Sequence, residues 1–101
     1  MNDTTQSLPT AHILVVDDEL AIRESMCEFI ETAGYTSSEA ASGDEALAIL
    51  ETENIDVVIT DIILHGMNGL ELTDKIRKKY DIDIIVMTGY SGDYSYEEAV
   101  S

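Results

Sequence analysis

Three aspartates at the ends of two apolar runs are the residues of this chain best suited to chemistry. Asp17 and Asp18 follow residues 13–16, and Asp61 follows residues 57–60. Each run is short, continuous and rich in Val and Ile, which predicts a strand buried on both faces of a sheet. Because ligands of an open parallel sheet bind in the crevice at the carboxyl ends of its strands, we expect the three carboxylates to meet there.

Three carboxylates in one crevice need protons or a cation. At a separation of ~4 Å and an effective dielectric constant near 20, two like charges repel each other by about 4 kcal/mol. Carboxylate oxygens are hard ligands of the type that Mg²⁺ prefers. A carboxylate beside a metal ion can also act as a nucleophile and form an acyl phosphate, and Asp61 is the best candidate because it stands alone at the end of its strand. Thr88 follows a further apolar run, so its hydroxyl is expected to point into the same crevice and donate to a phosphoryl oxygen.

The elements that must position these residues alternate along the chain. Strands are expected at residues 13–16, 35–40, 55–60 and 82–87, with helices at residues 20–33 and 69–80 and after a capping box at residues 42–45. Apolar residues at three- and four-residue spacing mark the first helix, namely Ile22, Met26, Phe29 and Ile30. The alternation predicts one parallel sheet built from right-handed crossovers, with helices on both faces.

Length, composition and charge limit the class of protein. The 101 residues suffice for one small domain, and a hydrophobic fraction of 45% predicts a folded chain although the formal net charge is -16. Such a charge repels nucleic acid and anionic membranes, so we expect direct binding to neither. The single cysteine, Cys27, cannot form an internal disulfide, and no apolar stretch reaches the ~18 residues of a membrane span. With no signal peptide at its start, the protein is expected to be cytoplasmic.

The basic residues are localised, since all except Arg23 lie within residues 75–79. One interpretation is that they complement the dipole at the C-terminus of a helix. The other is that they form a docking patch for an acidic partner.

Four segments, taken in order, resemble the receiver domain of two-component response regulators. They are residues 13–19 (ILVVDDE), 57–61 (VVITD), 66–72 (GMNGLEL) and 84–89 (IIVMTG), and the resemblance extends from about His12 onward. It implies a flavodoxin-like three-layer α/β fold with a parallel sheet in the strand order 2-1-3-4, and a receiver domain over residues 11–101 after a flexible leader at residues 1–10. It also implies a signalling module that is not an enzyme, capable at most of self-phosphorylation and autodephosphorylation on Asp61.

The same resemblance implies roles for the site residues. Asp61 would accept a phosphoryl group from a sensor histidine kinase or a phosphotransfer protein. Asp18 would bind Mg²⁺ directly and Asp17 mostly through water, and the backbone carbonyl of Ile63 would complete the protein ligands. Thr88 would be the switch hydroxyl that follows the phosphoryl group.

Two features depart from the receiver pattern. His65 stands in the loop after Asp61 where receivers usually carry a proline, although Gly66 and Gly69 remain to shape that loop. A receiver also continues into a fifth strand ending in a lysine and then a fifth helix, and no lysine follows Lys79. The missing ammonium would donate a charge-assisted hydrogen bond worth about 1.5–3 kcal/mol. We therefore expect a receiver domain that is incomplete at its C-terminal end, present as a fragment.

An incomplete sheet leaves other functions open. It would expose the apolar edge of the strand at residues 82–87, which is a template for pairing with another chain. The alternative function is therefore a non-switching receiver-like module that forms a homodimer through this strand or by exchange of its final helix.

A metal-dependent phosphatase is a third class, but such enzymes place a second acid two residues after the nucleophile, where this chain has Ile63. Flavin or nucleotide binding is disfavoured, because the first strand leads into acids and not into a Gly-rich phosphate cradle.

Overall fold

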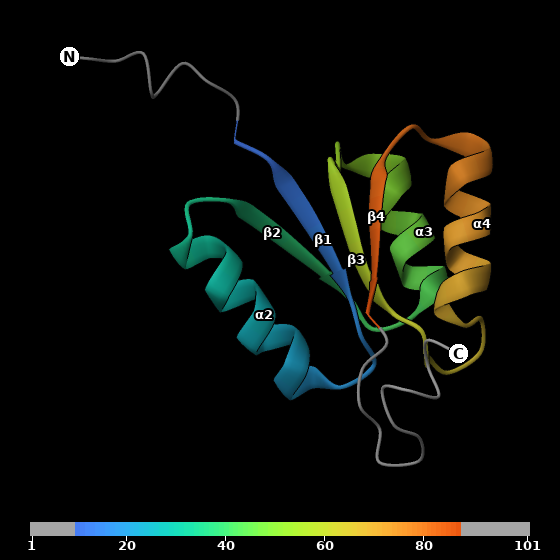
Figure 1. The fold of residues 1–101 in the computed structure, drawn as a ribbon, viewed down its shortest axis with the longest axis horizontal. Coiled ribbons are helices and arrows are strands. Elements are labelled where there is room, and N and C mark those ends of the chain that lie inside the picture. Colours follow the sequence, from blue (N-terminus) through green and yellow to red (C-terminus); the bar gives the residue numbers. More distant parts are fainter. Residues whose placement is uncertain (1–9, 88–101) are drawn as a thin grey trace.

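The computed structural model describes residues 10–87 as strands and helices in alternation (Figure 1). The elements in chain order are β1 (His12–Val16), α2 (Leu20–Thr32), β2 (Thr36–Ala40), α3 (Gly43–Thr52), β3 (Val57–Asp61), α4 (Gly69–Lys79) and β4 (Asp83–Met87). All strand pairs are parallel and the order is β2-β1-β3-β4, which confirms the predicted fold class. The predicted leader, Thr88 and the predicted final helix lie outside the described residues, residue 10 of the leader excepted.

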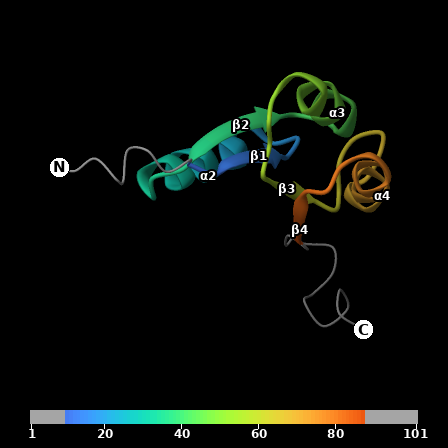
Figure 2. The same ribbon diagram turned by 90° about the horizontal axis from the view of Figure 1, so that it is seen from above.

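The sheet lies between two helical layers, with α2 on one face and α3 and α4 on the other (Figure 2). Successive residues of a strand point to opposite faces, so β1 supplies both cores. Leu14 and Val16 join the larger core under α3 and α4, while Val15 packs with Cys27 and Ile30 of α2. Burial on both faces explains why the strand sequence is continuously apolar.

Helix α2 covers only part of its face of the sheet. It contacts β1 and β2, and it buries Cys27 and Ile30. The regular spacing of apolar residues in this helix predicts one buried face, but the Phe29 side chain is 74% exposed and Ile22 is also exposed. The apolar stripe of α2 is therefore wider than the surface that the described residues bury. Among residues 10–87, no helix is long and apolar enough to cross a membrane.

The sheet order places β4 at one edge of the four strands. Ile85 of this strand is 52% exposed, whereas Val58 at the centre of the sheet is fully buried. Pairing of a second copy along this edge stays a prediction.

Local hydrogen bonds fix the starts of two helices. The Ser42 hydroxyl accepts from the Glu45 amide, but the Glu45 carboxylate accepts from the Ala41 amide, one residue before the cap. The capping box predicted at residues 42–45 is therefore only half correct. The complete reciprocal box lies at the start of α4, where Asn68 and Glu71 each accept from the other's amide.

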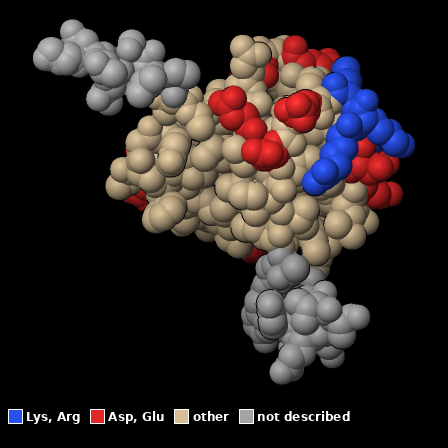
Figure 3. All heavy atoms as spheres, turned by 45° about the horizontal axis from the view of Figure 1, so that its top comes forward, with Lys and Arg blue, Asp and Glu red and all other residues tan. Residues whose placement is uncertain are grey.

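The lysines and arginines of this strongly acidic molecule, Arg23 of α2 excepted, lie on one helix. The basic residues of α4 are Lys75, Arg77, Lys78 and Lys79, and they form one band beside acidic side chains in Figure 3. Arg77, Lys78 and Lys79 lie in the last turn of α4, where cations complement the helix dipole. Lys78 also pairs with Asp74 at 3.1 Å, so part of this charge is already balanced within the helix.

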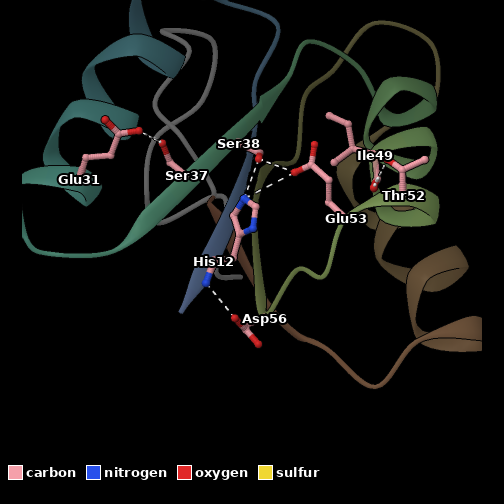
Figure 4. A network of polar contacts seen from close by, with 8 residues as sticks. All are labelled: His12, Glu31, Ser37, Ser38, Ile49, Thr52, Glu53 and Asp56. Carbon is pink, nitrogen blue, oxygen red and sulfur yellow. Dashed lines mark hydrogen bonds and ion pairs between the residues drawn. The ribbon is translucent and has the colours of Figure 1, made fainter. Parts of the chain in front are cut away.

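A polar network ties the strands together at their amino ends (Figure 4). The His12 amide donates to the Asp56 carboxylate at 2.8 Å, and the Asp56 amide donates to the His12 carbonyl at 2.8 Å. The Ser38 hydroxyl donates to Glu53 at 2.7 Å and lies 2.7 Å from Nε2 of His12. These contacts join β1, β2, the end of α3 and the residue before β3. They lie at the amino ends of the strands, whereas the three aspartates lie at the carboxyl ends.

Candidate functional site

The register of two central strands brings two of the predicted acids to the same edge. In the β1–β3 pair, Val16 lies opposite Thr60, and the next residue of each segment is an aspartate. Asp61 is the last residue of β3, and Asp17 follows the last residue of β1. The structure therefore brings Asp17 and Asp61 together at the carboxyl edge of the sheet, with Asp18 next to Asp17 in the turn before α2.

Asp17 is a buried carboxyl group, and one of its two oxygens accepts a hydrogen bond. Its side chain is 1% exposed, and Oδ1 accepts from the Glu19 amide at 2.9 Å. Burial raises the pKa of the Asp17 carboxyl above its ordinary value; the Glu19 amide opposes that rise, and the charges of Asp61 and Asp18 add to it. Within residues 10–87, no hydrogen bond reaches Oδ2. A buried oxygen beside two further acids is a site at which a cation would be stabilised.

Asp18 is engaged by the loop that follows β3. Its Oδ2 lies 3.2 Å from Nδ1 of His65, and the two side chains are 21% and 94% exposed. The sequence gives no periodic signal for this contact, because it joins two loops. The sequence places His65 in the loop after Asp61 but does not pair it with Asp18.

Asp61 is held at the start of the same loop. Its Oδ1 accepts from the Ile63 amide at 3.4 Å, and the Ile62 amide donates to the Met87 carbonyl of β4 at 3.2 Å. Gly69 closes the loop, because its amide donates to the Ile62 carbonyl at 2.8 Å. A Cβ atom on Gly69 would lie 2.0 Å from the Asp61 carbonyl oxygen, so only glycine allows α4 to begin this close to the acid.

Arg23 supports the acid pair from α2. Its NH1 donates to the Asp17 carbonyl at 2.9 Å, and its Nε donates to the Glu39 carboxylate of β2 at 3.0 Å. The Arg23 side chain is 14% exposed and that of Glu39 is 43% exposed, so the contact with the Asp17 carbonyl is the more buried of the two. Sequence reasoning assigned no role to this residue, although its isolation from the other basic residues was a signal that it serves a local purpose.

The three acids share an edge but have separate partners. Asp17 bonds to Glu19, Asp18 contacts His65 and Asp61 accepts from Ile63. In the part of the chain that the structure describes, no three His, Cys, Asp or Glu side chains lie close enough to form a metal-binding group. The donor set of carboxylate oxygens, one of them buried without a partner, nevertheless fits a hard divalent cation such as Mg²⁺.

Comparison with known proteins gives a consistent result over nearly the whole chain. A family model described as the response regulator receiver domain matches residues 13–101. The aerobic respiration control protein ArcA of Escherichia coli strain K12 is 39% identical over 82 residues, which cover 81% of this chain and 34% of ArcA.

Two solved structures show the same similarity. A response regulator receiver protein from Pseudomonas putida has a TM-score of 0.78 and 32% identity, covering 92% of this chain and 77% of that one. The match to a structure of histidine kinase ThkA in complex with response regulator protein TrrA has a TM-score of 0.76 and 45% identity, covering 85% of this chain and 75% of that one. The chain spans about a third of the length of the first curated relatives that it matches.

Proposed function

Because this chain belongs to the response regulator receiver domain family of two-component signalling, we propose that it accepts a phosphoryl group on Asp61 with Mg²⁺ bound in the acidic pocket. Receiver domains are signalling modules, and the proposed chemistry is limited to phosphorylation of Asp61 and its later hydrolysis. We place the domain at residues 11–101, after a leader at residues 1–10.

One observation carries the proposal: the buried Asp17 carboxylate lies beside Asp61 with an oxygen to which no described residue donates a hydrogen bond. The ionised form of such a carboxyl group is destabilised when no cation is near, as the raised pKa of Asp17 indicates. It becomes favourable next to a cation. A site that holds a cation beside a partly exposed aspartate is suited to receive a negatively charged phosphoryl group.

Each acid has a distinct part in this proposal. A carboxylate oxygen of Asp61 attacks the phosphorus of a phosphohistidine; the phosphorus–nitrogen bond breaks, and its electron pair stays on the histidine nitrogen. Asp18 would bind the Mg²⁺ ion directly, Asp17 mostly through water, and the Ile63 carbonyl would complete the protein ligands. When bound, Mg²⁺ supplies positive charge that offsets the repulsion between the carboxylates and the phosphoryl oxygens. Thr88 is proposed to follow the phosphoryl group with its hydroxyl.

The proposed phosphoryl donor is a sensor histidine kinase or a phosphotransfer protein. The support comes from similarity, because TrrA, a response regulator similar to this chain, has been crystallised with the histidine kinase ThkA. A small-molecule donor avoids the need to identify the kinase.

The proposal is tested by incubating the 101-residue chain with Mg²⁺ and acetyl phosphate, and separately with Mg²⁺ and beryllofluoride. We expect acetyl phosphate to give a phosphoryl adduct in the intact mass, assigned to Asp61 by peptide mapping, and beryllofluoride to shift the NMR signals of residues near Asp61. Both effects should be lost in Asp61→Asn. Asp56→Asn is the matched control, because Asp56 is an exposed aspartate at the opposite end of β3. A wild-type chain that stays unmodified under both conditions, or an adduct that persists in Asp61→Asn, contradicts the proposal.

A further inference from the structure

The loop after β3 carries one exposed side chain into contact with the acid pair. This loop is anchored at both ends by backbone hydrogen bonds, from Ile62 to Met87 and from Gly69 to Ile62. Within it Leu64 is buried in the larger core, whereas the His65 side chain is 94% exposed. The imidazole nevertheless lies 3.2 Å from Asp18, so His65 connects the β3–α4 loop to the β1–α2 turn.

We propose that His65 competes with Mg²⁺ for Asp18 and so lowers the affinity of the pocket for the cation. The inference rests on the proposed function, in which Asp18 binds Mg²⁺ directly. A Mg²⁺ ion lies only about 2.1 Å from its ligand oxygens. An ion on Oδ2 of Asp18 would therefore meet the N–H group of His65, and the contact has to open before the oxygen is free.

The contact between His65 and Asp18 does not require a charge on His65. A neutral imidazole with its proton on Nδ1 donates to a carboxylate, and so does the imidazolium. The opposite role, in which Nδ1 itself binds the cation, is disfavoured for Mg²⁺ because this ion prefers oxygen ligands.

Two substitutions separate these roles. His65→Ala removes the N–H donor. His65→Asn keeps one in a similar place, because the asparagine amide nitrogen, like Nδ1, is bonded to Cγ. Titration of the full chain with Mg²⁺ by calorimetry should show about two- to fivefold tighter binding in His65→Ala, as expected when an exposed polar contact is lost. His65→Asn should bind Mg²⁺ as the wild type does.

Location is checked by NMR, since Mn²⁺ should broaden the amide signals of Asp17, Asp18 and Asp61 in all three proteins. If His65→Ala binds Mg²⁺ as tightly as the wild type does, or more weakly, the inference about His65 is wrong. The proposed function would stand, because the wild type would still bind the ion. A folded wild-type chain that binds neither Mg²⁺ nor Mn²⁺ overturns both the inference and the metal site of the proposed function.

Discussion

The three acids of the pocket differ in environment although they share a residue type. Asp17 is almost fully buried, while Asp18 and Asp61 are partly exposed. Burial suits Asp17 to stabilise a cation in the pocket electrostatically, since its carboxylate is not accessible to another protein. Exposure suits Asp61 to react with a group that another molecule carries.

Asp17 gives the protein a pH dependence whose sign can be stated. Its folded-state pKa is raised above the ordinary value of 3.8, so the native protein binds more protons than the unfolded chain between 3.8 and the raised value. The contribution of Asp17 to the free energy of unfolding is therefore lost as the pH rises through that window. Asp17→Asn keeps an acceptor for the Glu19 amide and removes the charge. We expect its urea midpoint to exceed that of the wild type at pH 7, and the difference to disappear below pH 3.8.

Mg²⁺ provides the control for this prediction. If the cation offsets the charge of Asp17, added Mg²⁺ should raise the wild-type midpoint more than that of Asp17→Asn, which keeps Asp18 and Asp61. A variant that is less stable than the wild type at pH 7 without Mg²⁺ would contradict the assignment of Asp17 as an unfavourable buried charge.

At the level of elements, the start of α4 is set by the space beside Asp61. In most helices, replacing glycine with alanine stabilises by about 0.5–1 kcal/mol. At Gly69 the added Cβ would lie 2.0 Å from the Asp61 carbonyl oxygen, a backbone atom that cannot rotate away. We expect Gly69→Ala to lower the free energy of unfolding by about 1–3 kcal/mol, measured by urea denaturation.

Gly43→Ala is the matched control, because Gly43 is also the first residue of a buried helix start. Its added Cβ would meet the flexible side chain of Met67 at 3.0 Å. The expected change is much smaller than at Gly69. Equal losses in the two variants would show that the backbone contact with Asp61 is not the cause.

The elements were predictable wherever one continuous signal defined them. Apolar runs predicted β1, β3 and β4, whereas β2 is polar in its middle and lacks this signal. The order of the strands followed from the receiver resemblance. Strand β3 begins at Val57 and not at residue 55, because the Asp56 amide is already bonded to His12 outside the ladder. The contacts of His65 with Asp18 and of Arg23 with the Asp17 carbonyl were not predictable, since each depends on how a turn or loop is placed in space.

The whole molecule carries a charge that opposes its own compact state. The net charge is -16, all cations except Arg23 belong to α4, and Arg23 is used in local contacts. Raising NaCl from 0.1 to 1 M shortens the Debye length from about 10 Å to about 3 Å. Repulsion between the exposed acids is then screened, so we expect the urea midpoint to rise with NaCl.

A charge-reduced variant separates screening from other effects of salt. Asp81 and Asp83 are exposed acids at and before the start of β4, far in the strand direction from the acid pocket. The variant Asp81→Asn with Asp83→Asn should respond less to NaCl than the wild type does. A midpoint that falls with NaCl in the wild type would indicate that the attractive pairs on α4 outweigh the repulsion.

The His12 network has a consequence for how this sequence can vary. It joins β1, β2, α3 and the residue before β3 at one edge of the sheet, and the acids lie at the other. Strand register and pocket chemistry thus depend on different side chains. Substitutions in the pocket can alter reactivity or ion preference without releasing the contacts that align the strands.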